Sequence, residues 1–491
     1  MKAFDVLPNE VITEIFQFCL PEGKYQSPNP RHVPLLLMHV CSSWRSFTLS
    51  TPSLWQSIGF ETTGATPSKL PEATALAEVF KQQMALWSQN SRGQPLDLKL
   101  SLVYTPYVLL EEGGVPIFDT SFWSPFMASS IAKHAERIRK LYLATQSLNE
   151  DSPSPLLPEG SVMPLLESIH LQCKAMLPMT AQPFSQAPNL RKAIVDLRLL
   201  GSITIPINLP WKQLTHVVFV QAHPDELFFF VLSHCPLLEE LTMTINENSS
   251  HRSSPLITMP YLRSLSLTMS VDTTPTIFIG VFLPSLQNFT LKCDTYRLPQ
   301  SIKWLPITSA HDHLYNQFFT RLRTLKLGFH KIPAEVLLEM LRHCPQVDEL
   351  ALDVDVGSYP AFLNGLTYHE EFGPQILPNL QIFHFYVEIN IEGLNPTSVS
   401  DPTIPFTSAE FLSMIRSRGR SVNADTSEHR GSLRPLKQVH LFVERVPYMH
   451  ALDLDSLKLE VKRLPELRDI EFRFPILEDK LIWMAEEIGT W

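Results

Sequence analysis

The feature that most constrains the fold is a motif that recurs at a fixed period. The motif reads apolar-x-x-apolar-x-apolar. In six consecutive copies its first position is Leu166, Leu190, Leu214, Leu238, Leu262 and Leu286, each 24 residues after the one before. Another copy begins earlier at Ile138, and later copies begin at longer, irregular intervals at Leu322, Val347, Leu380, Leu436 and Leu467. A fixed period of this length is typical of solenoids built from stacked units.

Each copy predicts a short strand, because its last two apolar positions alternate with polar ones. One unit cannot bury its apolar edge alone, so stacking is expected to give a continuous core and a parallel sheet. The return segments Pro224–Cys235, Pro333–Cys344 and Phe411–Arg416 are predicted helices. Mobile loops are expected in four polar segments: Thr145–Ser161, Asn246–Pro255, Asn395–Thr407 and Ser417–Arg434.

The period and the L-x-x-L-x-L core resemble leucine-rich repeats. This resemblance implies an α/β fold, a solenoid with its parallel sheet on the concave face. The asparagine that commonly follows the strand in the best-known class is missing, so the repeats resemble a divergent type.

The first 55 residues carry a different pattern. A helix is predicted from Pro8, where a missing N–H costs nothing in the first turn, and Val11, Ile12, Ile15 and Phe16 form one apolar stripe along it. A second helix is predicted across Pro34–Leu49. About fifty residues are too few to bury so many large side chains alone, so this segment is expected to pack against something else.

Three blocks in this segment resemble the F-box: Leu-Pro-x-Glu with Ile-Phe, then Val-Cys-x-x-Trp-Arg, then Leu-Trp. The stretch CSSWRSFTLSTPSLWQSI is especially similar to F-box-like proteins of fungi. The resemblance implies a substrate receptor of a Skp–cullin–F-box (SCF) ubiquitin ligase, which binds a Skp-type adaptor and through it a cullin. The implied adaptor-facing and module-core residues are Leu7, Pro8, Ile12, Ile15, Phe16, Val40, Cys41, Trp44, Leu54 and Trp55.

The expected organisation has three parts: a helical module at 1–60, a linker helix and first strand at 61–103, and the solenoid at 104–491. Within the linker, Ala77–Ser88 is predicted as a helix and Pro95–Leu100 as the first strand. The module departs from the F-box pattern at Pro21–Pro30, a polar loop rich in breakers that stands where a tight connection is common.

Charge and composition exclude several classes of protein. The net charge of −10 argues against sequence-independent binding to nucleic acid. The six cysteines are scattered without a CxxC pair, which indicates reduced, buried residues in a cytoplasmic or nuclear protein. The N-terminus does not read as a signal peptide, and the longest apolar runs are too short for a membrane span. No membrane association is expected.

No motif for catalysis, metal binding or a cofactor is present. The chain lacks phosphate-binding glycine loops and the GxSxG and HExxH motifs. His369-Glu370-Glu371 lacks the second histidine of a zinc site. We therefore expect no enzymatic activity, no metal and no cofactor.

The strand residues that point away from the core are candidates for binding an unknown target protein, although a plain solvated sheet would look similar. Within this face His384, Tyr386, His440 and Phe442 form the candidate substrate-binding cluster. Two functions stay open: a ligase substrate receptor, or an interaction scaffold in which the F-box-like helices only cap the solenoid.

Overall fold

A computed structural model gives the structure of the chain. It describes residues 7–20, 25–61, 70–102, 131–145, 162–173, 184–197, 208–247, 256–269, 275–278, 280–293, 319–356, 359–368, 376–387, 408–419, 434–443 and 454–474. The chain divides into two compact units, residues 1–222 and 223–490, and each is described by itself.

The N-terminal module consists of short helices. They are α1 (Asn9–Phe18), α2 (Leu35–Met38), α3 (Ser42–Ser50) and the 3₁₀ turn η2 (Pro52–Trp55). The predicted helix over Pro34–Leu49 is thus two helices. Cys41 is extended, with φ −159° and ψ 172°, and its Sγ accepts a hydrogen bond from the Trp44 N–H at 3.5 Å. Helix α2 already ends at its C-cap His39, and the extended Cys41 caps the N-terminus of α3.

The first unit contains a parallel sheet whose strand order follows the chain. The strands are β1 (Ser57–Glu61), β2 (Leu96–Leu102), β3 (Ile138–Thr145), β4 (Ser168–Cys173), β5 (Lys192–Leu197) and β6 (His216–Pro224). Helix α4 (Leu70–Asn90) connects β1 to β2, and 3₁₀ turns precede β3 (η3, Ala135–Arg137) and β6 (η4, Trp211–Gln213).

In the second unit the sheet strands again run parallel and in chain order. They are β7 (Glu240–Glu247), β9 (Ser264–Met269), β11 (Asn288–Cys293), β12 (Thr324–Ile332), β13 (Glu349–Val356), β14 (Ile382–Val387), β15 (Gln438–Val443) and β16 (Glu471–Arg473). Two residues each of β8 (Ile257–Thr258) and β10 (Val281–Phe282) form a separate parallel pair. The 3₁₀ turns η5 (Pro275–Phe278) and η6 (Pro465–Leu467) complete the described connections.

The predicted repeat is confirmed at the level of strand register. In the first unit Ile169, Ala193 and Val217 pair across β4, β5 and β6, and each is the second apolar position of its motif. In the second unit the equivalent residues pair from Leu241 of β7 to Val439 of β15. The last copy differs from the prediction, because Val439 pairs with Phe472 of β16, the third apolar position of its motif, and not with Ile470, the second. All six leucines of the 24-residue series are fully buried. The chain is therefore an α/β protein with one parallel strand per repeat.

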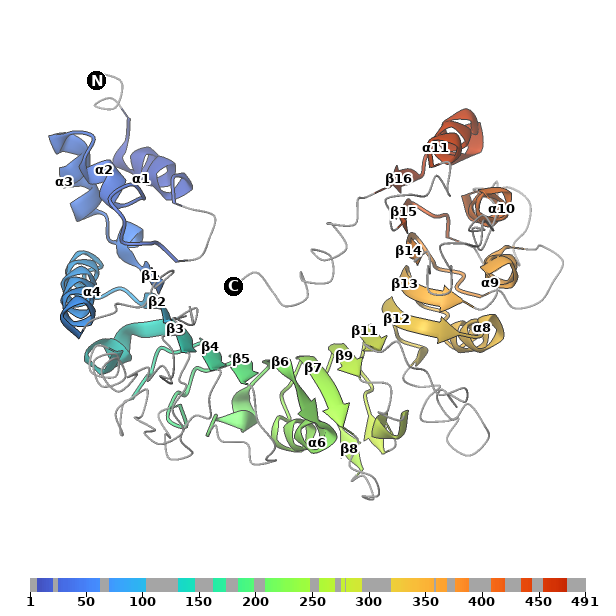
Figure 1. The fold of residues 1–491 in the computed structure, drawn as a ribbon, viewed down its shortest axis with the longest axis horizontal. Helices are drawn as coiled ribbons and strands as arrows, with labels where there is room; N and C mark the ends of the chain where they lie inside the picture. Colours follow the sequence, from blue (N-terminus) through green and yellow to red (C-terminus); the bar gives the residue numbers. More distant parts are fainter. Residues whose placement is uncertain are drawn as a thin grey trace, which may run out of the picture. The chain divides into compact units, whose positions relative to one another are not determined.

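Helices of the second unit lie along one face of its strands (Figure 1). They are α6 (Asp225–His234), α8 (Ala334–Arg342), α9 (Tyr359–Leu366), α10 (Ser408–Gly419) and α11 (Leu454–Arg463), and α9 packs against both α8 and α10. The three predicted return helices are confirmed as α6, α8 and part of α10. Helices α9 and α11 are additional.

The first strand of the sheet differs from the prediction. Pro95–Leu100 does contain a strand, β2, but β1 at Ser57–Glu61 precedes it and pairs with it in parallel. The predicted boundary at residue 60 therefore falls inside a strand. The predicted helix Ala77–Ser88 is confirmed as the C-terminal part of α4.

The four predicted mobile loops lie almost entirely outside the described residues. The exceptions are loop ends. Thr145 is the last residue of β3, Asn246 lies in β7, Ser417 to Gly419 form the last turn of α10, and Arg434 is described without regular structure. The prediction that the cysteines are buried is confirmed only in part. Cys235 and Cys344 are buried, whereas Cys19 is exposed and Cys41 is half-buried.

Candidate functional site

The ten residues predicted for the F-box-like module separate by burial into two sets. Ile12, Phe16, Leu54 and Trp55 are buried and form its core. Leu7, Pro8, Ile15 and Val40 are exposed, and Cys41 and Trp44 are half-buried. Only the exposed and half-buried residues are accessible to a partner.

Aromatic contacts hold the module core together. The ring of Phe16 lies 5.0 Å from that of Trp44 and 5.6 Å from that of Phe47. The Trp55 ring packs edge-on against Trp87 of α4 at 5.0 Å, and its indole N–H donates to the Thr48 carbonyl at 2.8 Å. The Leu-Trp block is therefore the contact between the module and the helix that follows it.

Helix α1 carries a second apolar face that contacts no core. Val11, Ile15 and Phe18 of α1, together with Leu7 just before the helix, are here called the α1 stripe and are 37 to 87% exposed. Residues spaced by three or four positions share one face of a helix. Sequence reasoning placed Val11 and Ile15 in one stripe with Ile12 and Phe16, but the structure turns the two pairs to different faces. Phe18 was missed; its spacing from Ile15 was the available signal.

More exposed apolar side chains lie nearby in the sequence. Leu36 of α2 is 44% exposed and Val40 is 52% exposed. Large exposed apolar side chains in one module are a common feature of protein-binding sites.

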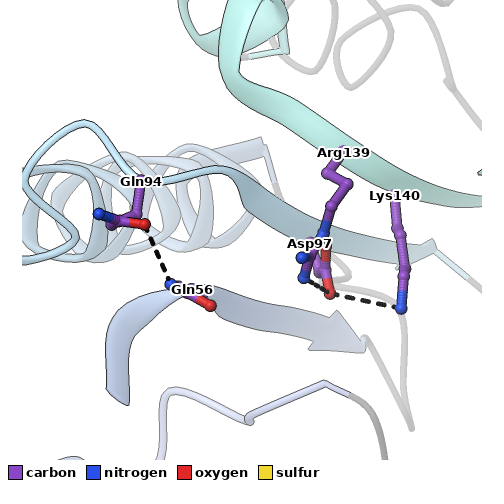
Figure 2. Close-up of polar contacts among 5 residues, drawn as sticks. All are labelled: Gln56, Gln94, Asp97, Arg139 and Lys140. Carbon is purple, nitrogen blue, oxygen red and sulfur yellow. Dashed lines mark hydrogen bonds and ion pairs between the residues drawn. The ribbon is translucent and has the colours of Figure 1, made fainter. Parts of the chain in front are cut away.

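The module is joined to the sheet by a polar cluster (Figure 2). The Asp97 N–H donates to the Gln56 carbonyl at 2.7 Å, and the side-chain amides of Gln56 and Gln94 hydrogen-bond at 3.5 Å. The buried Asp97 carboxylate accepts two bonds of 2.9 Å from Arg139 and lies 3.8 Å from Lys140. Bonding to this carboxylate raises the pKa of Arg139. Strands β1, β2 and β3 are thus fastened at one edge.

The described part of the predicted Pro21–Pro30 loop crosses β1. A Cβ at Gly59 would lie 2.9 Å from the Cβ of Tyr25, so only glycine admits this approach without displacement. The Gly59 N–H donates to the carbonyl of the buried Gln26 at 2.8 Å, and Gln83 of α4 donates to the Pro28 carbonyl. Burial, with Asp97 nearby, raises the pKa of Tyr25. The inserted loop therefore packs against the sheet from Tyr25 onward.

A polar ladder crosses β3 to β6 of the first unit. The Tyr142 hydroxyl donates to Gln172 at 2.8 Å, and the Gln172 amide donates to Asp196 at 2.9 Å. Gln221 donates to the other carboxylate oxygen of Asp196 at 2.6 Å. His170 packs edge-on against Tyr142 at 4.4 Å, and burial lowers its pKa to about 4. This face is ordered by its own hydrogen bonds and keeps His170 neutral.

The predicted substrate-binding cluster forms, but little of it is accessible. The rings of His384 and His440 lie 4.6 Å apart, and those of Tyr386 and Phe442 stack at 4.0 Å. Tyr386, His384 and Phe442 are 2, 6 and 5% exposed, whereas His440 is half-buried. Burial lowers the pKa of His384 to about 3, despite the Glu349 carboxylate 3.6 Å away. Substrate binding by these residues stays a prediction, with His440 the most accessible of the four.

Within the described ranges, no group of three or more His, Cys, Asp or Glu residues is placed to hold a metal ion. Burial raises the pKa of the Cys235 thiol to about 12 and also raises that of Cys344, so both thiols are protonated at neutral pH. None of the helices in the described residues combines the length and apolar character needed to cross a bilayer.

These features define the class of protein: an α/β repeat protein, with one parallel strand per repeat and a helical module before its first strand. No protein-family model matches the chain, and no curated protein matches it.

Among solved structures, the chain is similar to a Bacteroides fragilis protein from a structural genomics consortium. The identity is 14%, the match covers 68% of this chain and 76% of that one, and the TM-score is 0.28. It is also similar to the TLR13–ssRNA13 complex, with 12% identity, 84% and 58% coverage and a TM-score of 0.31. Scores this low carry no argument about fold or function, so the description of the chain as a repeat protein rests on its own strands and their register.

Proposed function

We propose that the chain is a substrate-recognition adaptor of an SCF-type ubiquitin ligase. In this proposal the N-terminal module binds a Skp-type adaptor and through it a cullin, and the solenoid binds a target protein in the cytoplasm or nucleus. The chain performs no covalent chemistry, and other subunits transfer ubiquitin.

The observation that carries the proposal is the α1 stripe. Three large apolar residues of α1 and Leu7 just before it are exposed, in the sequence block that resembles the start of an F-box. Covering a leucine, valine, isoleucine or phenylalanine side chain gains about 1.5 to 3 kcal/mol for full burial. Leu7, Val11 and Ile15 expose little more than a third of their surface, so covering each gains about a third of that amount, whereas covering Phe18 gains most of it. Covering the stripe therefore favours binding by a few kcal/mol, against the cost of association.

The test is co-purification with a Skp-type adaptor. Val11→Glu with Ile15→Glu places two charges in the stripe without touching the buried core, and it should abolish adaptor binding. Glu10→Gln with Glu14→Gln is the matched control, since it changes two exposed residues of the same helix and should leave binding intact. Adaptor capture by the charged stripe variant at the level of the unmodified chain would refute the proposal.

Other variants at the predicted F-box residues are informative but less clean. Leu7→Ala with Pro8→Ala alters exposed residues and should also weaken capture. Trp44→Ala should abolish it, but Trp44 contacts the buried Phe16 ring, so this change also loosens the module. The stripe variant therefore decides the question.

A second candidate function is an interaction scaffold without a ligase connection. The observation that favours it is the continuity of module and sheet, because β1 follows the module within two residues of Trp55 and pairs with β2. An end strand needs cover against further pairing, and a helical cap supplies it. Affinity purification with mass spectrometry separates the two functions, since the scaffold would purify without adaptor or cullin.

A further inference from the structure

The second unit contains a basic cavity at the turns that enter its strands. The cavity has a volume of about 520 Å³ and is lined by Arg263, Pro284, Ser285, Gln287, Thr320, Arg321, Arg323 and Gln346. Among the described residues that line it, arginine is the sole charged type. This concentration contrasts with the net charge of −10 of the whole chain.

The repeat register brings the arginines together. Arg263, Gln287 and Arg323 occupy the same position in successive repeats, directly before β9, β11 and β12. The Gln287 N–H donates to the Arg263 carbonyl at 2.9 Å, and the Arg323 N–H donates to the Gln287 carbonyl at 2.8 Å. Neighbouring strands lie about 4.8 Å apart, so the backbones of the two arginines are about 10 Å apart across one glutamine. Side chains as long as arginine can converge over that distance.

The third arginine is held in place by the turn. Arg321 lies two residues before Arg323, and its guanidinium donates to the Pro284 carbonyl at 2.6 Å. Ser285 in the same wall donates to the Pro260 carbonyl at 2.6 Å. These bonds fix the wall of the cavity beside the other two arginines.

The guanidinium groups of Arg263 and Arg323 are not engaged by other described residues. Their side chains form no hydrogen bond or ion pair with any residue of the described ranges, although both are exposed. The acidic residues of the flanking repeats at the same position, Glu239 and Asp348, do not line the cavity. Two guanidinium groups are thus available to a ligand.

The chemistry of the cavity points to a phosphate group. A guanidinium presents fixed pairs of N–H donors that match phosphate and carboxylate oxygens. Three of them around one cavity exceed the single charge of a carboxylate, whereas a phosphorylated side chain carries about −1.5 to −2 charges and three strong acceptors.

We propose that this cavity binds the phosphate of a phosphorylated protein segment. The source is a protein rather than a nucleic acid, because a nucleic acid needs cations along its whole path and the repeats on either side carry Glu239 and Asp348. This cavity would then be part of the surface with which the solenoid binds its target. That the ligand is a protein depends on the proposed function.

Peptide binding to the purified full chain tests the proposal. An array of phosphoserine peptides with random flanking residues is compared with the same peptides carrying serine or glutamate. Binders are then measured by fluorescence anisotropy. We expect phosphopeptides to bind about tenfold or more tightly than their serine forms, with weakening at high salt and displacement by inorganic phosphate.

Variants connect that binding to the cavity. Arg263→Gln and Arg323→Gln should each weaken phosphopeptide binding about tenfold, since each removes charged hydrogen bonds. Lys437→Gln is the matched control, because Lys437 is exposed at the same repeat position before β15 and lies outside the cavity. It should change binding by less than about twofold, which is the range of an exposed charge acting at a distance. Melting curves of all three variants should coincide, since each residue is exposed.

The proposal is overturned if serine peptides bind as tightly as phosphopeptides, if the arginine variants bind like the Lys437 control, or if a single-stranded RNA of equal charge binds more tightly. The assay contains no adaptor, so failure of the ligase proposal at the α1 stripe does not alter its outcome.

Discussion

Arg418 connects three segments of the second unit through its buried side chain. It lies in the last turn of α10, is 2% exposed, and donates to the carbonyls of Leu366, Ile376 and Leu377 at 2.7, 2.6 and 2.9 Å. Burial lowers the pKa of its guanidinium to about 10, so it stays charged at neutral pH. Leu377 has a φ of 52°, a left-handed conformation that costs a leucine about 1 to 2 kcal/mol.

Arg418→Met keeps the length of the side chain and removes every donor. A hydrogen bond to a charged group contributes about 1.5 to 3 kcal/mol, so the loss of the bonds to three carbonyls costs well over about 3 kcal/mol in total. Removing a buried charge that faces no carboxylate regains several kcal/mol of desolvation free energy, which leaves a net loss of about 3 kcal/mol. Arg418→Lys should lose about half as much, because one ammonium cannot reach three carbonyls in the geometry of a guanidinium.

Amide hydrogen exchange measures this effect locally. Residues 359–366 and 408–419 should lose protection equivalent to about 3 kcal/mol in Arg418→Met. Arg342→Met on α8 is the matched control, since Arg342 is exposed and, among the residues that the structure describes, pairs only with Glu339 of its own helix. A loss below about 1 kcal/mol, within the range of an ordinary surface change, would refute the assignment of Arg418 as the connection between these segments.

Three further predictions concern stability. Burial lowers the pKa values of His170 and His384 to about 4 and about 3, so the unfolded chain takes up more protons below about pH 6.5. Unfolding free energy should therefore fall from about pH 6.5 towards pH 4 by at most about 1.4 kcal/mol per unit for each histidine, and His384→Gln should flatten this slope in urea titrations. Trp55→Ala should cost about 3 to 5 kcal/mol and expose the module to proteolysis; an unchanged cleavage pattern would contradict its placement between module and α4. Gly365→Ala puts a Cβ 2.8 Å from the Cδ2 of Leu338 and should destabilise the α8–α9 contact by about 1 to 3 kcal/mol, with Leu338→Ala in the same chain relieving part of that cost. Equal and additive losses in the double variant would argue against the close contact.

The strands were predictable because each repeat places apolar residues at the same positions. The L-x-x-L-x-L motif sets both the buried positions and the register, so the alignment of Leu241 with Leu265 and Phe289 follows from the period. Helix α9 was not predictable in the same way. It contains Pro360 and Gly365, which usually break helices, but the proline occupies the first turn, where it is tolerated.

The candidate sites depended on contacts that the sequence does not display. The accessibility of Ile15 and the burial of Phe16 are set by which face of α1 the module core takes up. Arg418 fell in a segment predicted as a polar loop, and its three acceptors lie 41 to 52 residues away in the chain. The basic cavity had a readable signal, since Arg263 and Arg323 each follow the first leucine of a repeat.

The pairing of β1 with β2 also sets the orientation of the N-terminal module within the first unit. Only one residue, Gln56, lies between Trp55 and the start of β1, so no flexible linker separates the module from the sheet. A protein bound to α1 would therefore take its orientation from β1, β2 and β3 rather than from a search over linker conformations. Inserting a few glycines at Gln56 would replace this short connection with a flexible linker, and the module would then reorient relative to the sheet.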